Sequence, residues 1–70
     1  MKKIYATVIR NRKRIGNTCV ISRELLDEIL NDKKNYRVRS YENLGDIIVY
    51  DIVHTSDDGI MSWIIISEEI

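Results

Sequence analysis

Residues 47–67 read IIVYDIVHTSDDGIMSWIIIS, two runs of β-branched and aromatic residues on either side of a polar break. Such residues favour β-strands, and Asp58-Gly59 is a typical pair at a tight hairpin turn. The pattern predicts an antiparallel hairpin with strands at 47–54 and 60–67. Both strands are predicted to be apolar on both faces, which is unusual for a sheet with one face in water.

Three further strands are predicted before this hairpin, at residues 3–9, 15–21 and 36–41. The first two are runs of β-branched and small side chains, and the third alternates between the two faces of a strand. Polar residues 11–14 separate the first pair, which indicates a hairpin. Gly45 marks the turn that precedes the strand at 47–54.

The residues after Ser22 carry the pattern of a short helix between the second and third strands. Ser22 can cap its first turn by accepting a hydrogen bond from a free N–H group. Ile21 and Leu26 are spaced to form a hydrophobic staple. The helix is expected to end within 31–34 and to present one apolar face, made of Leu25, Leu26, Ile29 and Leu30.

These elements predict an α+β fold, a mostly antiparallel sheet of about five strands with one short helix, in the order β-β-α-β-β-β. A length of 70 residues supports a single small domain spanning 1–70, because so short a chain buries only one core. A three-turn helix covers only part of one sheet face. The other face could be covered by curling of the sheet, by a second copy or by a partner, and we expect a homodimer or a protein partner.

Charge is unevenly distributed along the chain although the net charge is zero. Residues 1–23 hold seven basic residues and no acid, and residues 42–70 hold seven acids and no base. The two ends can still neutralise each other if they pair in one sheet. No apolar run is long enough for a signal peptide or a membrane span, so a cytoplasmic location and no membrane are expected.

The chain offers little for catalysis. Cys19 and His54 are its only cysteine and histidine, and no third group or flanking signature accompanies them. The lone cysteine is expected to be a small buried hydrophobe. We therefore predict that the protein is not an enzyme and that it binds neither a metal ion nor a cofactor.

The densest functional signal is the basic run at residues 10–14. Its four cations, at a hairpin tip, could contact phosphates or a partner protein, and two cations on a later strand could extend the patch. The competing interpretation is a solvated loop that the acidic end of the chain balances. The candidate residues are Arg10, Arg12, Lys13, Arg14, Arg37 and Arg39.

A second candidate surface is acidic and apolar. Negative side chains in the last third of the chain could engage a basic site on a host protein, because complementary charge steers encounter. An ordinary solvated face is the alternative. The candidate residues are Asp46, Asp51, Asp57, Asp58, Trp63, Glu68 and Glu69.

The run RIGNTCVIS at 14–22, followed by Leu25, Leu26, Ile29 and Leu30, resembles the swapped-hairpin DNA-binding domains of AbrB-type regulators and MazE-type antitoxins. The resemblance covers roughly residues 10–54. It implies two interlocked chains and DNA contact by Arg10, Arg12 and Arg14. The chain departs from the family at Ser22, where proline is usual, and in its additional strand at 60–67.

The leading functional prediction is a non-catalytic protein-binding module. It would be a phage or mobile-element accessory protein that inhibits or modulates a host protein through its apolar sheet face and charged rim. One alternative is a dimeric DNA-binding regulator that uses the basic hairpin, so nucleic acid remains a possible partner. The other is a structural subunit of a larger assembly.

Overall fold

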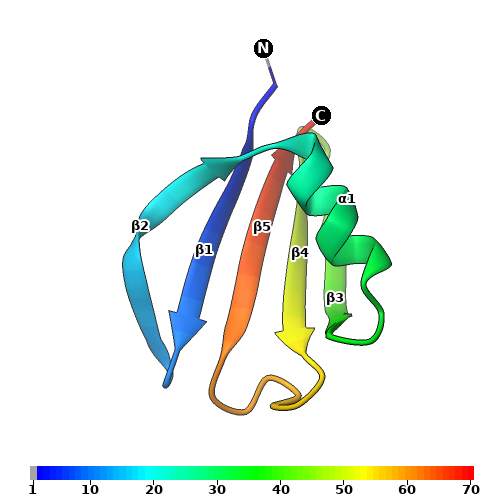
Figure 1. The fold of residues 1–70 in the computed structure, drawn as a ribbon. Helices are drawn as coiled ribbons and strands as arrows, with labels where there is room; N and C mark the ends of the chain where they lie inside the picture. Colours follow the sequence, from blue (N-terminus) through cyan, green and yellow to red (C-terminus); the bar gives the residue numbers. More distant parts are fainter. Residues whose placement is uncertain (1) are drawn as a thin grey trace.

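A computed structural model describes residues 2–70 and contains the elements in the expected order. They are β1 (Ile4–Arg10), β2 (Lys13–Ile21), α1 (Arg23–Asn31), β3 (Tyr36–Asn43), β4 (Ile47–His54) and β5 (Trp63–Glu69). The strands form one sheet in the order β2-β1-β5-β4-β3, and each neighbouring pair is antiparallel. The predicted α+β class is confirmed (Figure 1).

The last strand lies in the middle of the sheet. β5 is inserted between β1 and β4, so it joins the β1–β2 hairpin to the β3–β4 hairpin. This arrangement sets the acidic C-terminal residues beside the basic N-terminal segment. Arg23, at the start of α1, forms an ion pair with Glu68 of β5, so part of the charge separation along the chain is cancelled in the fold.

The core lies between α1 and one face of the sheet. Leu26 is fully buried against Ile52 and Ile66 from the two central strands, and Ile4 and Ala6 complete the buried cluster. Ser22 caps the helix as predicted, because its Oγ accepts a hydrogen bond from the N–H of Leu25 at 3.1 Å. Figure 1 shows α1 over the β3–β4–β5 side of the sheet, which leaves β1 and β2 without a helix above them.

The opposite face of the sheet carries no helix, and we call it the open face. Paired residues share a face and alternate along each strand, so the register assigns its apolar side chains. They are Tyr5, Ile9, Val20, Ile47, Val49, Trp63 and Ile65. The polar residues Thr7, Asp51, Ser67 and Glu69 interrupt this apolar surface. Val53, at the end of the face where β5 begins, is fully buried.

The predicted start of the last strand, at residue 60, is wrong, because residues 55–62 form a loop. The N–H groups of Asp57 and Asp58 both donate to the carbonyl of His54, at 3.1 and 2.8 Å. The Asp57 carboxylate accepts the N–H of Met61 at 3.1 Å. These bonds turn the chain before it can pair with β4, so β5 begins only at Trp63.

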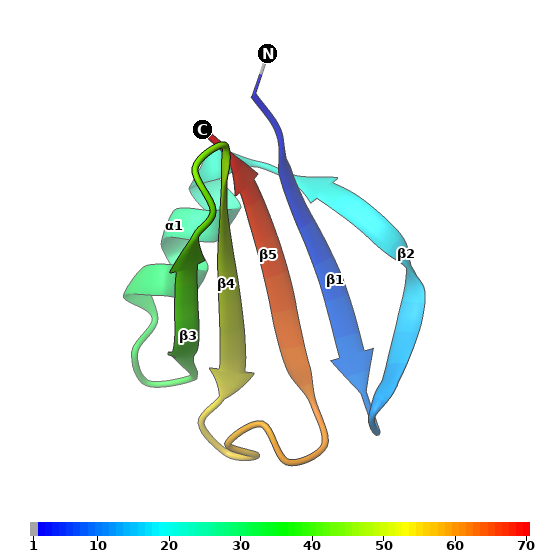
Figure 2. The same cartoon turned by 180° about the vertical axis from the view of Figure 1, so that it is seen from behind.

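β2 is an edge strand and bows away from β1 along its middle (Figures 1 and 2). Residues 16–18 have no partner in the ladder, and Gly16 has a φ of 66°, which is typical of a bulge. The prediction that Cys19 is buried is wrong: it lies on this edge and is exposed, because α1 does not reach it. Within residues 2–70 no helix is long and apolar enough to cross a membrane.

Candidate functional site

The basic run forms the tip of the β1–β2 hairpin. Arg10 pairs with Lys13 across a two-residue turn made of Asn11 and Arg12. Both turn residues have positive φ, 53° and 63°, as a hairpin turn of this length requires. Asparagine tolerates this conformation well, whereas arginine is held in it at a cost of about 1 kcal/mol.

Hydrogen bonds hold this tip against the β4–β5 loop. The backbone N–H of Arg12 donates to the carbonyl of Met61 at 2.8 Å, and its Nε reaches the carbonyl of Ile60 at 3.4 Å. The side chains of Ile60 and Met61 are 64% and 40% exposed. The two loops therefore form one surface, the basic end, made of Arg10, Arg12, Lys13, Arg14, Ile60 and Met61.

The four cations of the basic end are not neutralised within the fold. Among residues 2–70, no carboxylate lies within ion-pair distance of these side chains. Their charge is thus available to a partner. Two large apolar side chains stand exposed beside them, which is a combination more typical of an interaction surface than of a solvated loop.

Arg37 and Arg39 lie on β3, at the opposite edge of the sheet from β2. Arg37 forms an ion pair with Asp58. Arg39 donates from Nε and Nη2 to Asp51, at 3.0 and 2.7 Å, and from Nη1 to the carbonyl of Gly59 at 3.2 Å. Both guanidinium groups are therefore engaged by their own chain, and neither extends the basic end as an unpaired cation.

The acidic candidates lie at several places in the sheet. Asp46, Glu68 and Glu69 are at the end that holds the C-terminus, and Asp57 and Asp58 are in the β4–β5 loop at the other end (Figure 2). Glu68 is occupied by Arg23 and by the hydroxyl of Tyr50 at 3.2 Å.

The apolar candidate, Trp63, lies at the start of β5 on the open face. The Arg39 guanidinium stacks over its ring, 5.5 Å from the centroid. The fold therefore does not gather the acidic candidates into one surface around Trp63.

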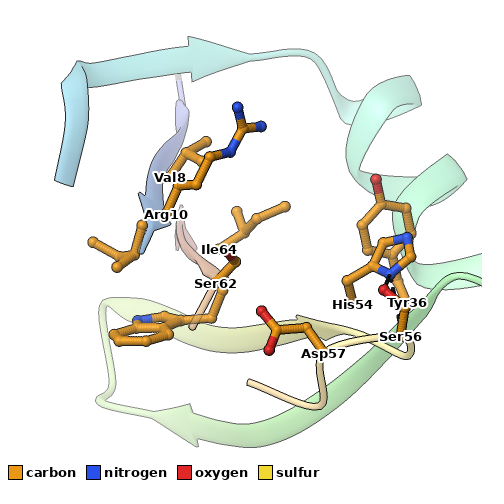
Figure 3. Close-up of a pocket in the computed structure, with 10 residues that line it drawn as sticks. Val8, Arg10, Tyr36, His54, Ser56, Asp57, Ser62 and Ile64 are labelled. Carbon is orange, nitrogen blue, oxygen red and sulfur yellow. Dashed lines mark hydrogen bonds between the residues drawn. The ribbon is translucent and has the colours of Figure 1, made fainter. Parts of the chain in front are cut away.

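An open pocket of about 340 Å³ lies on the helix side of the sheet, beyond the part of the sheet that α1 covers (Figure 3). Val8 and Ile64 line its apolar part, Arg10 lies on one side, and Tyr36 and His54 lie on the other. The ring of Tyr36 meets the imidazole edge to face, with centroids 5.5 Å apart.

His54 has local hydrogen-bond partners only. Its Nδ1 accepts the backbone N–H of Ser56 at 3.2 Å and lies 2.7 Å from the Ser56 hydroxyl, which leaves the neutral imidazole proton on Nε2. Cys19 is on β2, and two strands, β1 and β5, separate it from β4, the strand of His54. The fold does not bring the two residues together.

Ile60 and Met61 are the members of the basic end that sequence reasoning missed, because it placed them inside a strand. One signal in the sequence indicated a longer loop here. Asp57, Asp58 and Gly59 all favour turns, and a two-residue hairpin turn does not need all three. The resemblance to swapped-hairpin regulators spans residues 10–54, which run from the end of β1 to the end of β4. The strand that the resemblance does not include, β5, lies at the centre of this sheet. Comparison of the chain with protein-family models, curated proteins and solved structures finds no match.

Proposed function

We propose that the chain is a non-catalytic protein-binding module that docks on its partner through the basic end. The observation that carries this proposal is Arg12, an arginine held at a positive φ of 63° and hydrogen-bonded to a loop with exposed Ile60 and Met61. Strained backbone at an exposed position concentrates at functional sites. A glycine would adopt this turn conformation without strain. The strain is therefore best explained by a role for the arginine side chain.

The composition of the basic end indicates the chemistry of the partner. Four unpaired cations beside two exposed apolar side chains are complementary to a surface that has carboxylates around an apolar patch. The partner that we propose is a host protein with such a surface, and occupation of that surface would inhibit or modulate it. A phage or mobile-element origin remains part of this proposal. It is motivated by composition alone, namely thirteen isoleucines, five asparagines, no proline and no phenylalanine.

The surroundings of the basic end favour a protein over nucleic acid. Ile60 and Met61 would lie against phosphates without contributing to the binding of a backbone. Asp57 belongs to the same loop and would repel phosphates. Arg37 is already paired with Asp58, so the basic surface is confined to the hairpin tip.

A photo-cross-linking experiment tests the proposal. A photoreactive benzoylphenylalanine replaces Ile60 in one variant and Tyr41, which is similarly exposed on β3, in a control variant. Both are irradiated in a bacterial lysate. We expect an adduct with a defined protein from position 60 and not from position 41, and binding of that protein, once purified, to be lost in Arg12→Ser/Arg14→Ser.

A matched pair of variants controls for net charge. Lys33→Ser/Lys34→Ser removes the same charge from the turn between α1 and β3 and is expected to leave binding unchanged. The absence of any adduct specific to position 60 would contradict the proposal. Salt-sensitive binding of mixed duplex DNA in a fluorescence-anisotropy titration, abolished by Arg12→Ser/Arg14→Ser, would replace it with the DNA-binding alternative.

A further inference from the structure

The part of the sheet that α1 leaves uncovered carries a row of apolar side chains on its helix side. Paired residues share a face of the sheet, and Val8 pairs with Ile15 of β2 and with Ile64 of β5. Ile64 pairs in turn with Ile52, which is fully buried in the core beneath α1. We call Ile64, Val8 and Ile15 the apolar row. It continues the core beyond the edge of the helix, and its outer member, Ile15, is 47% exposed.

A row of polar residues borders the apolar row toward the end of the sheet where β5 begins. Arg10 pairs with Lys13, and both lie two positions along their strands from members of the apolar row and therefore on the same face. At the other end of the polar row, His54 pairs with Tyr36. The pocket of about 340 Å³ lies where the two rows meet (Figure 3).

The charge around the pocket is positive on one side only. In the part of the chain that the structure describes, no carboxylate lies within ion-pair distance of Arg10 or Lys13. Asp57 lines the side that the β4–β5 loop forms, and its carboxylate accepts the N–H of Met61. A ligand with one carboxylate would therefore place it beside the two cations, away from Asp57.

We infer that the pocket receives an apolar side chain of the partner protein that is flanked by a carboxylate. This inference rests on the proposed function and deepens it, because it names the feature of the partner that the site selects. Arg10 belongs both to the basic end and to the pocket, so a partner docked on the basic end lies beside the pocket. Apolar anchors that fill such pockets supply much of the binding energy of protein interfaces.

Both halves of this chemistry are needed to satisfy the site. An apolar side chain alone would leave Arg10 and Lys13 without a counter-charge, and a carboxylate alone would leave the apolar row in water. A protein is favoured over a free small molecule because the apolar row continues past the pocket to Ile15, which does not line it. Only a larger occupant covers both the pocket and this exposed side chain.

A titration with 3-phenylpropionate, which joins an apolar ring to a carboxylate, tests the chemistry of the pocket. We expect it to shift the methyl NMR signals of Val8 and Ile64 in the full chain and to leave those of Val20 and Ile65, on the open face, unchanged. The uncharged analogue 3-phenylpropanol should bind about tenfold more weakly, because it loses the charge-assisted contact. Propionate, which lacks the ring, should cause no saturable shift.

Three variants locate the probe. Arg10→Gln removes the cation at the edge of the pocket and should weaken binding of 3-phenylpropionate about tenfold. Lys3→Gln removes the same charge just before β1, at the opposite end of the sheet, and should have no effect. Ser62→Phe places a ring in the pocket, which Ser62 lines, and should abolish binding. Circular dichroism shows whether each variant is folded, and Arg10→Gln keeps the test valid if Ser62→Phe is not.

The protein that is cross-linked from position 60 provides the second arm of the test. Ser62→Phe should weaken its binding about thirtyfold or more, the loss typical of an anchor that is denied its pocket. Arg10→Gln should weaken it about tenfold, and Lys3→Gln should leave it unchanged.

The outcomes separate this inference from the proposed function. An adduct from position 60 whose protein binds Ser62→Phe as tightly as wild type would overturn the inference and leave the proposed function in place. Probe binding without any adduct would contradict the proposed function, and the pocket would then be a site for free carboxylates. Methyl signals of Val8 and Ile64 that do not respond to 3-phenylpropionate, or equal affinity for 3-phenylpropanol, would overturn the chemistry assigned to the pocket.

Discussion

Replacing Gly59 by alanine should disrupt the contact between the β4–β5 loop and the open face. Gly59 has a φ of 79°. A Cβ at this position would lie 2.7 Å from Val53 Cγ1 and would overlap the Nη1 atom of Arg39. The end of the arginine can move aside, but Val53 is fully buried and has no space to move into.

Gly16→Ala is the matched control for this substitution. Gly16 has a similar φ of 66°, and no atom lies within 4 Å of the position that its Cβ would take. Its replacement should cost only the backbone strain, about 1 kcal/mol. Gly59→Ala adds overpacking against a buried valine, worth about 1–3 kcal/mol, so we expect a total loss of about 2–4 kcal/mol.

Urea denaturation followed by Trp63 fluorescence measures both free energies of unfolding. The expected difference of about 2 kcal/mol corresponds to about 10 °C in Tm for a chain of this size. Equal losses in the two variants would show that the loop does not pack on Val53. Val53→Ala should recover part of the loss when combined with Gly59→Ala, because it removes the methyl group that the new Cβ meets.

Three further substitutions test other local features. Arg12→Gly should abolish partner binding but leave the free energy of unfolding within about 0.5 kcal/mol of wild type, because relief of backbone strain offsets the greater freedom of the unfolded chain. A loss of stability above about 1 kcal/mol in urea denaturation would argue against a strained turn. Ser22→Ala should cost about 1 kcal/mol through the lost cap of α1, and an unchanged urea midpoint would contradict the capping geometry. Arg39→Lys should cost about 1 kcal/mol, discounted for partial exposure, and should change the emission of Trp63, whereas an unaltered spectrum would show that the guanidinium does not stack there.

Local patterns in the sequence were sufficient to predict the elements of the fold. Ser22 and the apolar spacing after it located α1, and the run at 47–54 located β4 with the same bounds that the structure shows. Strand order was not predictable in the same way, because it depends on pairing between residues far apart in the sequence. The insertion of β5 between β1 and β4 is such a pairing.

The candidate site was predictable only in part for a related reason. The cations of the basic end are adjacent in the sequence, so their clustering needed no knowledge of the fold. Ile60 and Met61 join them through a hydrogen bond from Arg12 to Met61, across 49 positions of the chain. Their β-favouring side chains suggested a strand, and the Asp57 carboxylate, which accepts the N–H of Met61, overrode that local preference.

The two edge strands, β2 and β3, limit where another chain can bind to the sheet. An edge strand can pair with another chain through its free backbone groups, and cations and bulges on that edge oppose such pairing. β2 carries Lys13 and Arg14 and a bulge at residues 16–18, and β3 carries Arg37 and Arg39 with a break in register after Val38. Because both edges are blocked, a second copy or a partner would have to use the open face or the basic end. The two surfaces share Arg14, so a chain bound to one of them would approach the other at this residue.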